Sequence, residues 1–249
     1  MKTKMTFEEY IINPMGKNNA VFSNMDLYRN LYTDKFNKLM VRENSKINYN
    51  ILKSKDAYFI ILKIPSESTE NLYYDVCIKF DTKSVVPKTS IKDCPVKFFS
   101  NDPYFCYTFA YAFNKKGLFV DELESKMDKI FLTKKAIERN PSNEVGYDKI
   151  IYFAFLAMQL KGLFNTVKVD TESQPYSKES LLNLVTDSNS KINERQERGL
   201  LNRKKKKETK DPSQRVENNK LPFQTRKVQN TKSVKSTRSV KSTKRIGKR

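Results

Sequence analysis

A hairpin pattern occupies residues 47–64, which read Ile47-Asn-Tyr-Asn-Ile-Leu-Lys-Ser-Lys-Asp-Ala-Tyr-Phe-Ile-Ile-Leu-Lys-Ile64. Apolar side chains occupy every second position from Ile47 to Ile51 and again from Tyr58 to Ile64, with a polar turn between the two runs. Because successive side chains of a strand point to opposite faces, a period of two is typical of a β-strand with one buried face. Two such runs joined by a short polar turn predict a β-hairpin.

Two further runs continue the same pattern along the chain. Residues 72–80 place Tyr74 and Phe80 on one face and Asp75 on the other, and residues 96–99 form a short fourth run. No long crossover separates the four strands. This arrangement favours an antiparallel meander with one face covered by helices.

Helices are predicted on both sides of the strands. Thr6-Phe-Glu-Glu9 has the spacing of a capping box, and Asp102-Pro103 combines a capping carboxylate with proline at the first helical position. Lys-Gly-Leu-Phe occurs at residues 116–119 and 161–164, as expected for two glycine C-caps. The expected helices span about residues 6–13, 23–41, 102–116, 121–132, 144–161, 177–184 and 191–201, and Val167 and Val169 suggest an added edge strand.

Together these patterns predict an α+β fold with N-terminal helices, a four-stranded antiparallel meander, C-terminal helices and then a disordered basic tail. The first 200 residues are enough to enclose one core, and the chain's 16 Phe and 13 Tyr supply the apolar bulk. We therefore expect a globular domain over residues 1–200 and a disordered, Lys/Arg-rich tail over residues 201–249, with a six-residue repeat from residue 231.

The positive charge of the chain is concentrated at its C-terminal end. The 249 residues include 48 Lys+Arg and 28 Asp+Glu, which gives a net charge of +20. The segment from Leu200 to Arg249 contains 18 basic and 3 acidic residues, so it carries +15 and the first 199 residues carry +5. This excess is larger than solubility requires, and it indicates a polyanionic partner rather than a merely solubilising tail.

A six-residue repeat carries part of this charge. Thr-Lys-Ser-Val-Lys-Ser begins at Thr231, is repeated with one Arg for Lys at Thr237, and is degraded at Thr243. Its cations fall at every third position, which would place them on one face of a polyproline II helix. With no apolar face to bury, the tail cannot offset the entropy of ordering. The residues expected to bind nucleic acid are Arg203, Lys204, Lys205, Lys206, Lys207, Lys232, Lys235, Arg238, Lys241, Lys244, Arg245, Lys248 and Arg249.

Cations of this kind bind phosphates, which carry no sequence information. The tail has a single aromatic residue, Phe223, so it cannot stack bases along a strand. We therefore expect binding to DNA, or to another nucleic acid, without sequence specificity. An anionic membrane would attract the same charge, but no amphipathic segment or lipid anchor accompanies it. We therefore expect no membrane partner.

The composition disfavours most catalytic and metal sites. The chain has no histidine, which excludes Ser-His-Asp and Cys-His nucleophiles and His-ligated metals. Cys77, Cys94 and Cys106 show no CxxC spacing and are interpreted as buried thiols in a reducing compartment. Six glycines leave little room for a Gly-rich phosphate loop. We expect no enzymatic activity, no catalytic residues, no metal site and no cofactor.

One enzymatic alternative stays open. Asp75 lies within the third strand and Asp81-Thr-Lys83 follows it, which loosely resembles the carboxylates and lysine of a Mg²⁺-dependent nuclease. Asp-x-Lys is common by chance in a Lys-rich chain, so a turn is the favoured interpretation. The N-terminal Met1-Lys2-Thr3-Lys4 leads into no apolar run, so we expect neither a signal peptide nor a membrane span.

Three stretches resemble a known group of proteins. They are Thr6-Phe-Glu-Glu-Tyr-Ile-Ile-Asn-Pro-Met-Gly16, Phe99-Ser-Asn-Asp-Pro103 running into Phe109-Ala-Tyr-Ala-Phe-Asn-Lys-Lys-Gly-Leu-Phe119, and Tyr152-Phe-Ala154 to Phe164. They are similar to small structural or assembly-type proteins of tailed bacteriophages of low-GC hosts. The resemblance covers about residues 5–200, with the basic tail as an addition, and it supplies no catalytic residues.

The resemblance implies a phage gene product in the virion or the host cytoplasm. We therefore expect a non-enzymatic structural or assembly protein. Its body would contact other phage proteins or copies of itself, and its tail would bind DNA. The alternatives are a non-virion phage DNA-binding protein acting in replication or host takeover, and the Mg²⁺-dependent nuclease.

Overall fold

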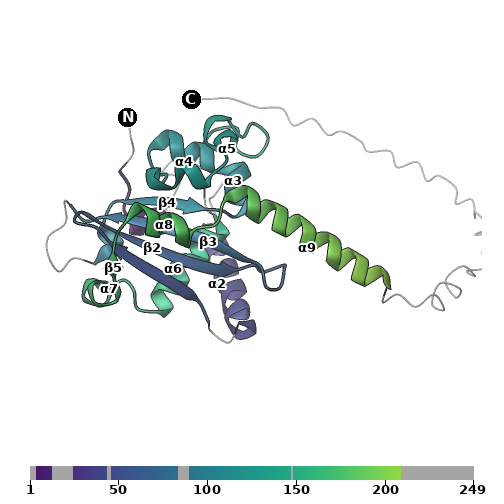
Figure 1. Ribbon diagram of the computed structural model, residues 1–249, viewed down its shortest axis with the longest axis horizontal. Helices are drawn as coiled ribbons and strands as arrows, with labels where there is room; N and C mark the ends of the chain where they lie inside the picture. The colour runs from purple at the N-terminus through teal and green to yellow at the C-terminus, as the bar shows by residue number, and fades with distance from the viewer. Residues whose placement is uncertain (1–3, 13–24, 44–45, 84–89, 147, 209–249) are drawn as a thin grey trace, which may run out of the picture. The chain divides into compact units, whose positions relative to one another are not determined.

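The computed structural model describes residues 4–12, 25–43, 46–83, 90–146 and 148–208 (Figure 1). The described residues up to Lys205 form one compact unit with an α+β fold. Its elements are, in chain order, α1 (Phe7–Ile12), α2 (Met25–Arg42), β1 (Asn48–Lys53), β2 (Ala57–Pro65), β3 (Tyr73–Asp81), the 3₁₀ helix η2 (Ile91–Asp93), β4 (Val96–Ser100), α3 (Pro103–Thr108), α4 (Ala110–Lys116), the 3₁₀ helix η3 (Asp121–Lys126), α5 (Lys129–Thr133), α6 (Lys149–Leu160), α7 (Thr166–Glu172), β5 (Gln174–Pro175), α8 (Lys178–Leu184) and α9 (Ser188–Glu208).

The sheet confirms the predicted hairpin and meander and adds a strand to them. β1 to β4 pair antiparallel with their chain neighbours, and Ile60 of β2 lies opposite Ile78 of β3. β5 then pairs parallel with β1, so the sheet is mixed, has five strands and runs in the order β4-β3-β2-β1-β5. The edge strand predicted from Val167 and Val169 is wrong, because both residues lie in α7 and the chain becomes extended only after it.

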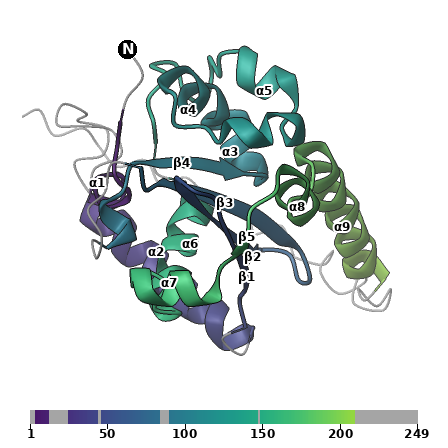
Figure 2. The same ribbon diagram turned by 60° about the vertical axis from the view of Figure 1, so that its left-hand side comes forward.

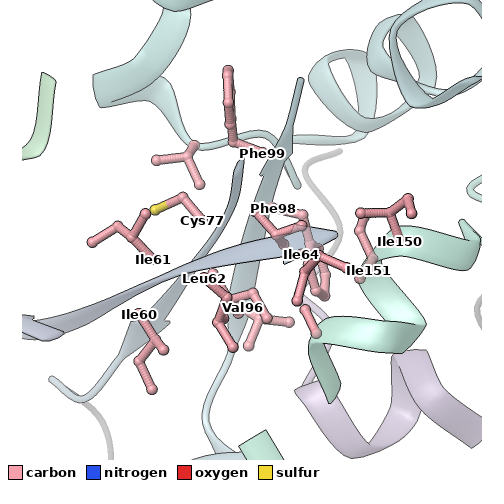
Figure 3. Packing of buried hydrophobic residues seen from close by; sticks show 14 of the residues in the cluster. Ile60, Ile61, Leu62, Ile64, Cys77, Val96, Phe98, Phe99, Ile150 and Ile151 are labelled. Atoms are coloured by element: carbon pink, nitrogen blue, oxygen red, sulfur yellow. The ribbon is translucent and has the colours of Figure 1, made fainter. Parts of the chain in front are cut away.

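Helices cover both faces of the sheet, whereas the sequence predicted that only one face would be covered. Figure 2 shows α2 and α6 on one side of the sheet and α8 and α9 on the other. In Figure 3, Ile60 and Leu62 point to the opposite side from Ile61 and Cys77, and all four are at most 1% exposed. The run Ile60-Ile61-Leu62 breaks the strict alternation for this reason: a strand buried on both faces needs apolar residues at consecutive positions.

The predicted helix caps are confirmed. Thr6 and Glu9 form the reciprocal capping box, and the Asp102 carboxylate accepts from the backbone N–H groups of Tyr104 and Phe105. Gly117 and Gly162 adopt φ values of +75° and +64°, in the left-handed region that glycine tolerates. In both motifs the N–H of the following leucine donates to the carbonyl five residues earlier, as a Schellman C-cap requires.

Several predicted helices have different bounds in the structure. The helix expected over residues 102–116 is divided at Phe109, whose φ of −115° interrupts it between α3 and α4. The helix expected over 121–132 consists of η3 and α5, separated at Asp128, which caps α5. The helix expected from Glu144 begins at Lys149, because Asp148 is its N-cap.

The last helix crosses the boundary predicted at residue 200. α9 runs from Ser188 to Glu208, so the backbone of the Arg203–Lys207 cluster is helical rather than part of an unstructured tail. The repeat from residue 231 and its predicted disorder lie outside the described residues.

The three cysteines are buried and unbridged, as predicted from their spacing. Burial raises the pKa of the Cys94 thiol to about 11 and raises the pKa values of Cys77 and Cys106 as well. All three thiols therefore stay protonated at neutral pH and are poor nucleophiles.

Candidate nucleic-acid interface

The N-terminal end of α9 and the residue Thr186 before it are fixed to the body by contacts from two other segments. The backbone N–H of Thr186 donates to the Asp75 carboxylate on β3 at 2.8 Å. The Ser188 hydroxyl accepts from the backbone N–H of Asp128 at 3.0 Å, and Asn189 donates to the Asp128 carboxylate at 2.8 Å. The helix therefore leaves the body with its first turn held firmly in place.

The charges of α9 change character along its length. In the first half, Glu194 pairs with Lys191 at 2.8 Å and with Arg198 at 2.9 Å, so these charges largely neutralise one another. The last turns carry Arg203–Lys207, five consecutive cations at the C-terminal end, where the helix dipole favours positive charge. The remaining residues predicted to bind nucleic acid, Lys232 to Arg249, lie outside the described residues.

Two adjoining pockets that share Tyr107 and Arg139 in their linings form a groove along α3. Its larger part has a volume of about 510 Å³ and is lined by α3, α4, α5 and the segment that follows α5. Its smaller part, of about 330 Å³, is lined by α3 and α9. Tyr107 and Arg139 line both parts. We call this feature the tyrosine groove, defined by Tyr104, Tyr107, Tyr111, Phe131, Lys134, Lys135, Arg139 and Arg195.

Aromatic rings form the exposed wall of the tyrosine groove. Tyr104 and Tyr107 are 48% and 44% exposed, which is high for aromatic side chains of this size. The Tyr107 ring meets the Phe131 ring edge to face at 4.8 Å, and the Arg139 guanidinium lies 5.6 Å from its centre. These contacts hold the Tyr107 ring in one orientation while leaving much of it open to solvent.

The charged residues that line the groove are mostly positive. Lys134, Lys135, Arg139 and Arg195 stand against one acidic residue, Glu138. Within the described part of the chain, none of these four cations has a carboxylate oxygen within 4.0 Å of its charged nitrogens. The groove thus offers cations that form no direct ion pair with a carboxylate of the described residues, beside partly exposed rings.

Sequence reasoning missed this groove. The sequence predicted a helix over 102–116 but assigned it no binding residues, whereas Tyr104 and Tyr107 are exposed in the structure. The available signal was spacing: Tyr104, Tyr107 and Tyr111 are three and four residues apart and would share one face of the continuous helix predicted over 102–116. The residues that surround these tyrosines could not be predicted from the sequence, because Arg139 and Arg195 come from distant segments of the chain.

The structure does not bring the proposed nuclease residues together. The Asp75 side chain is fully buried, and it accepts from Lys63 at 2.9 Å, from Asn101 at 3.1 Å and from the Thr186 N–H. Asp81 lies six residues further along the same strand, about 20 Å away at the usual rise per residue, so the two carboxylates cannot share a metal ion. The Asp81 carboxylate accepts from the Lys83 backbone N–H at 3.0 Å, which supports the turn interpretation.

The described residues contain neither a metal-binding cluster nor a membrane-spanning helix. No group of three or more His, Cys, Asp or Glu side chains in that part of the chain is placed to hold a metal ion. None of the helices described is both long enough and apolar enough to cross a membrane.

Comparisons with known proteins give no further lead. No family model matches this sequence, and neither a curated protein nor a solved structure matches it.

Proposed function

We propose that this chain is a non-enzymatic nucleic-acid-binding protein whose basic C-terminal segment binds DNA without sequence specificity. The observation that carries the proposal is the charge distribution: +15 of the net +20 lies in the last 50 residues. The segment begins on α9, a helix whose first turn is held by the body. Residues 203–207 form the last turns of this helix, and the remaining cations follow along the chain.

The mechanism of binding is counterion release. Each phosphate neutralised by a Lys or Arg releases condensed cations, so the logarithm of the binding constant falls linearly with the logarithm of the salt concentration. The slope is about −0.9 per phosphate contacted on duplex DNA. It therefore counts the contacts that the basic segment makes.

Replacing Arg203–Lys207 by five glutamines should reduce the steepness of this salt dependence by up to about 4.5, because five phosphate contacts are lost. Glutamine has nearly the helix propensity of lysine and arginine, so the backbone of α9 should be retained. The measurement is the affinity of the full chain for a labelled duplex by fluorescence anisotropy between about 50 and 200 mM salt.

A matched control removes five positive charges from the body instead. Its substitutions to glutamine are made at the exposed residues Lys4, Lys38, Lys46, Lys55 and Lys178. This variant should keep nearly the wild-type slope. Equal slopes for the wild type and the Arg203–Lys207 variant would show that this cluster is not a DNA contact.

We further propose that the body acts as a structural or assembly component of a tailed bacteriophage, contacting other phage proteins or copies of itself. The support for this part is the resemblance of residues 5–200 to such proteins. Mass spectrometry of purified particles tests it. Absence of the chain from particles would instead favour a non-virion DNA-binding protein acting in replication or host takeover.

A further inference from the structure

The tyrosine groove combines two features that the basic segment lacks on its own. Phe223 is the only aromatic residue among residues 203–249, so that segment can bind phosphates but cannot stack bases. The groove presents Tyr104 and Tyr107, each more than two-fifths exposed, together with Tyr111 and Phe131. Four cations line the same groove. Exposed rings beside cations are the elements from which single-strand binding sites are built.

We propose that the tyrosine groove binds single-stranded nucleic acid, with bases stacked on Tyr104 and Tyr107 and phosphates held by Lys134, Lys135, Arg139 and Arg195. This inference rests on the proposed nucleic-acid-binding function and deepens it by naming a site on the body and a preferred strand form. The groove contributes base contacts, and the basic segment contributes phosphate contacts.

The geometry of Tyr107 suits base stacking. Its ring is braced on its edge by Phe131, so little side-chain freedom remains to be lost when a base binds. Arg139 lies over the ring at 5.6 Å, where its guanidinium can stack with a base or reach an adjacent phosphate. The volume of about 510 Å³ lies within the range of sites that bind small organic groups.

The position of the groove favours a nucleic acid over other occupants. α9 lines the smaller part of the groove with Arg195, and the same helix carries Arg203 two turns later. At 1.5 Å per residue these two positions are about 12 Å apart along the helix axis. The four cations against one carboxylate give the groove the opposite charge to that strand.

The test compares two labelled strands of about 20 nucleotides: oligothymidylate, and an abasic strand with the same phosphates. Wild-type protein should bind oligothymidylate about tenfold or more tightly than the abasic strand, because only the former can stack. The double variant Tyr104→Leu, Tyr107→Leu should bind oligothymidylate no more tightly than the abasic strand, and its affinity for the abasic strand should equal that of the wild type. Tyr104→Phe with Tyr107→Phe keeps the rings and should keep the ratio. Tyr49→Leu, on β1 at the other side of the sheet, is the matched control and should also keep it.

The possible outcomes separate this inference from the proposed function. Equal binding of both strands by the wild type, with a steep salt dependence, would overturn the groove site and leave the basic segment as the DNA contact. No binding of either strand would overturn both. A leucine variant that keeps the ratio but changes the sedimentation of the protein without DNA would overturn the inference too, because it would assign the groove to contacts between copies of the chain.

Discussion

Replacing Asp75 with alanine is expected to lower the free energy of unfolding by about 3 to 5 kcal/mol. The carboxylate is fully buried, and it joins β2 through Lys63, the end of β4 through Asn101, and the loop before α9 through the Thr186 N–H. Removing it takes away three charge-assisted hydrogen bonds at once and leaves the Thr186 N–H without its acceptor. Urea denaturation of the wild type and the variant measures the difference.

The exposed Asp56, in the turn between β1 and β2, provides the control for the loss of an aspartate. Asp56→Ala should change the stability by no more than about 0.5 kcal/mol, the usual range for surface substitutions. A loss below about 1 kcal/mol for Asp75→Ala would show that the network does not hold these segments together.

The second prediction with a large effect is that the stability of the protein depends on pH through Asp148. This carboxyl is buried at the N-terminus of α6, where one oxygen accepts from the Ile151 N–H at 2.8 Å and the other has no hydrogen-bond partner among the described residues. Burial, followed by the charge of Asp102, raises the pKa of Asp148 from 3.8 to about 8, and neighbouring Lys149 only partly opposes this. Folded Asp148 is therefore protonated across the pH range in which the unfolded chain has already ionised.

Asp148→Asn should consequently become more stable relative to the wild type as the pH rises from about 4 to 8. In that interval the unfolded wild type binds fewer protons than the folded one, so the stability contributed by the protonated carboxyl is full below pH 3.8 and is lost as the pH approaches 8. The amide cannot ionise and keeps the oxygen that caps the helix. We expect the difference to reach a few kcal/mol, since each pKa unit corresponds to about 1.4 kcal/mol.

Thermal unfolding of both proteins at several pH values measures this difference. Subtracting the stability of the wild type from that of the variant at each pH cancels the contribution of the other carboxylates, which are common to both proteins. A difference that stays constant between pH 5 and 9 would contradict the raised pKa. Asp102→Asn provides a second check. Removing the Asp102 charge should lower the pKa of Asp148 and so shorten the pH interval over which the protein loses stability.

Local signals in the sequence correctly identified the elements with short-range causes. The alternation in residues 47–64 predicted β1 and β2, because side-chain period is a property of the strand itself. Asp102-Pro103 and the two Lys-Gly-Leu-Phe endings predicted helix ends, because caps are hydrogen bonds between residues a few positions apart. The charge of the last 50 residues likewise follows from composition alone.

Only the tertiary structure decided which faces and edges are covered. β5 joins the sheet beside β1 through residues more than 120 positions away in the chain. Helix α8 and the loop after it cover the face that the sequence left to solvent, and α3 exposes Tyr104 and Tyr107. These outcomes depend on contacts between distant segments, and neither a propensity nor a period measured over a few residues contains that information.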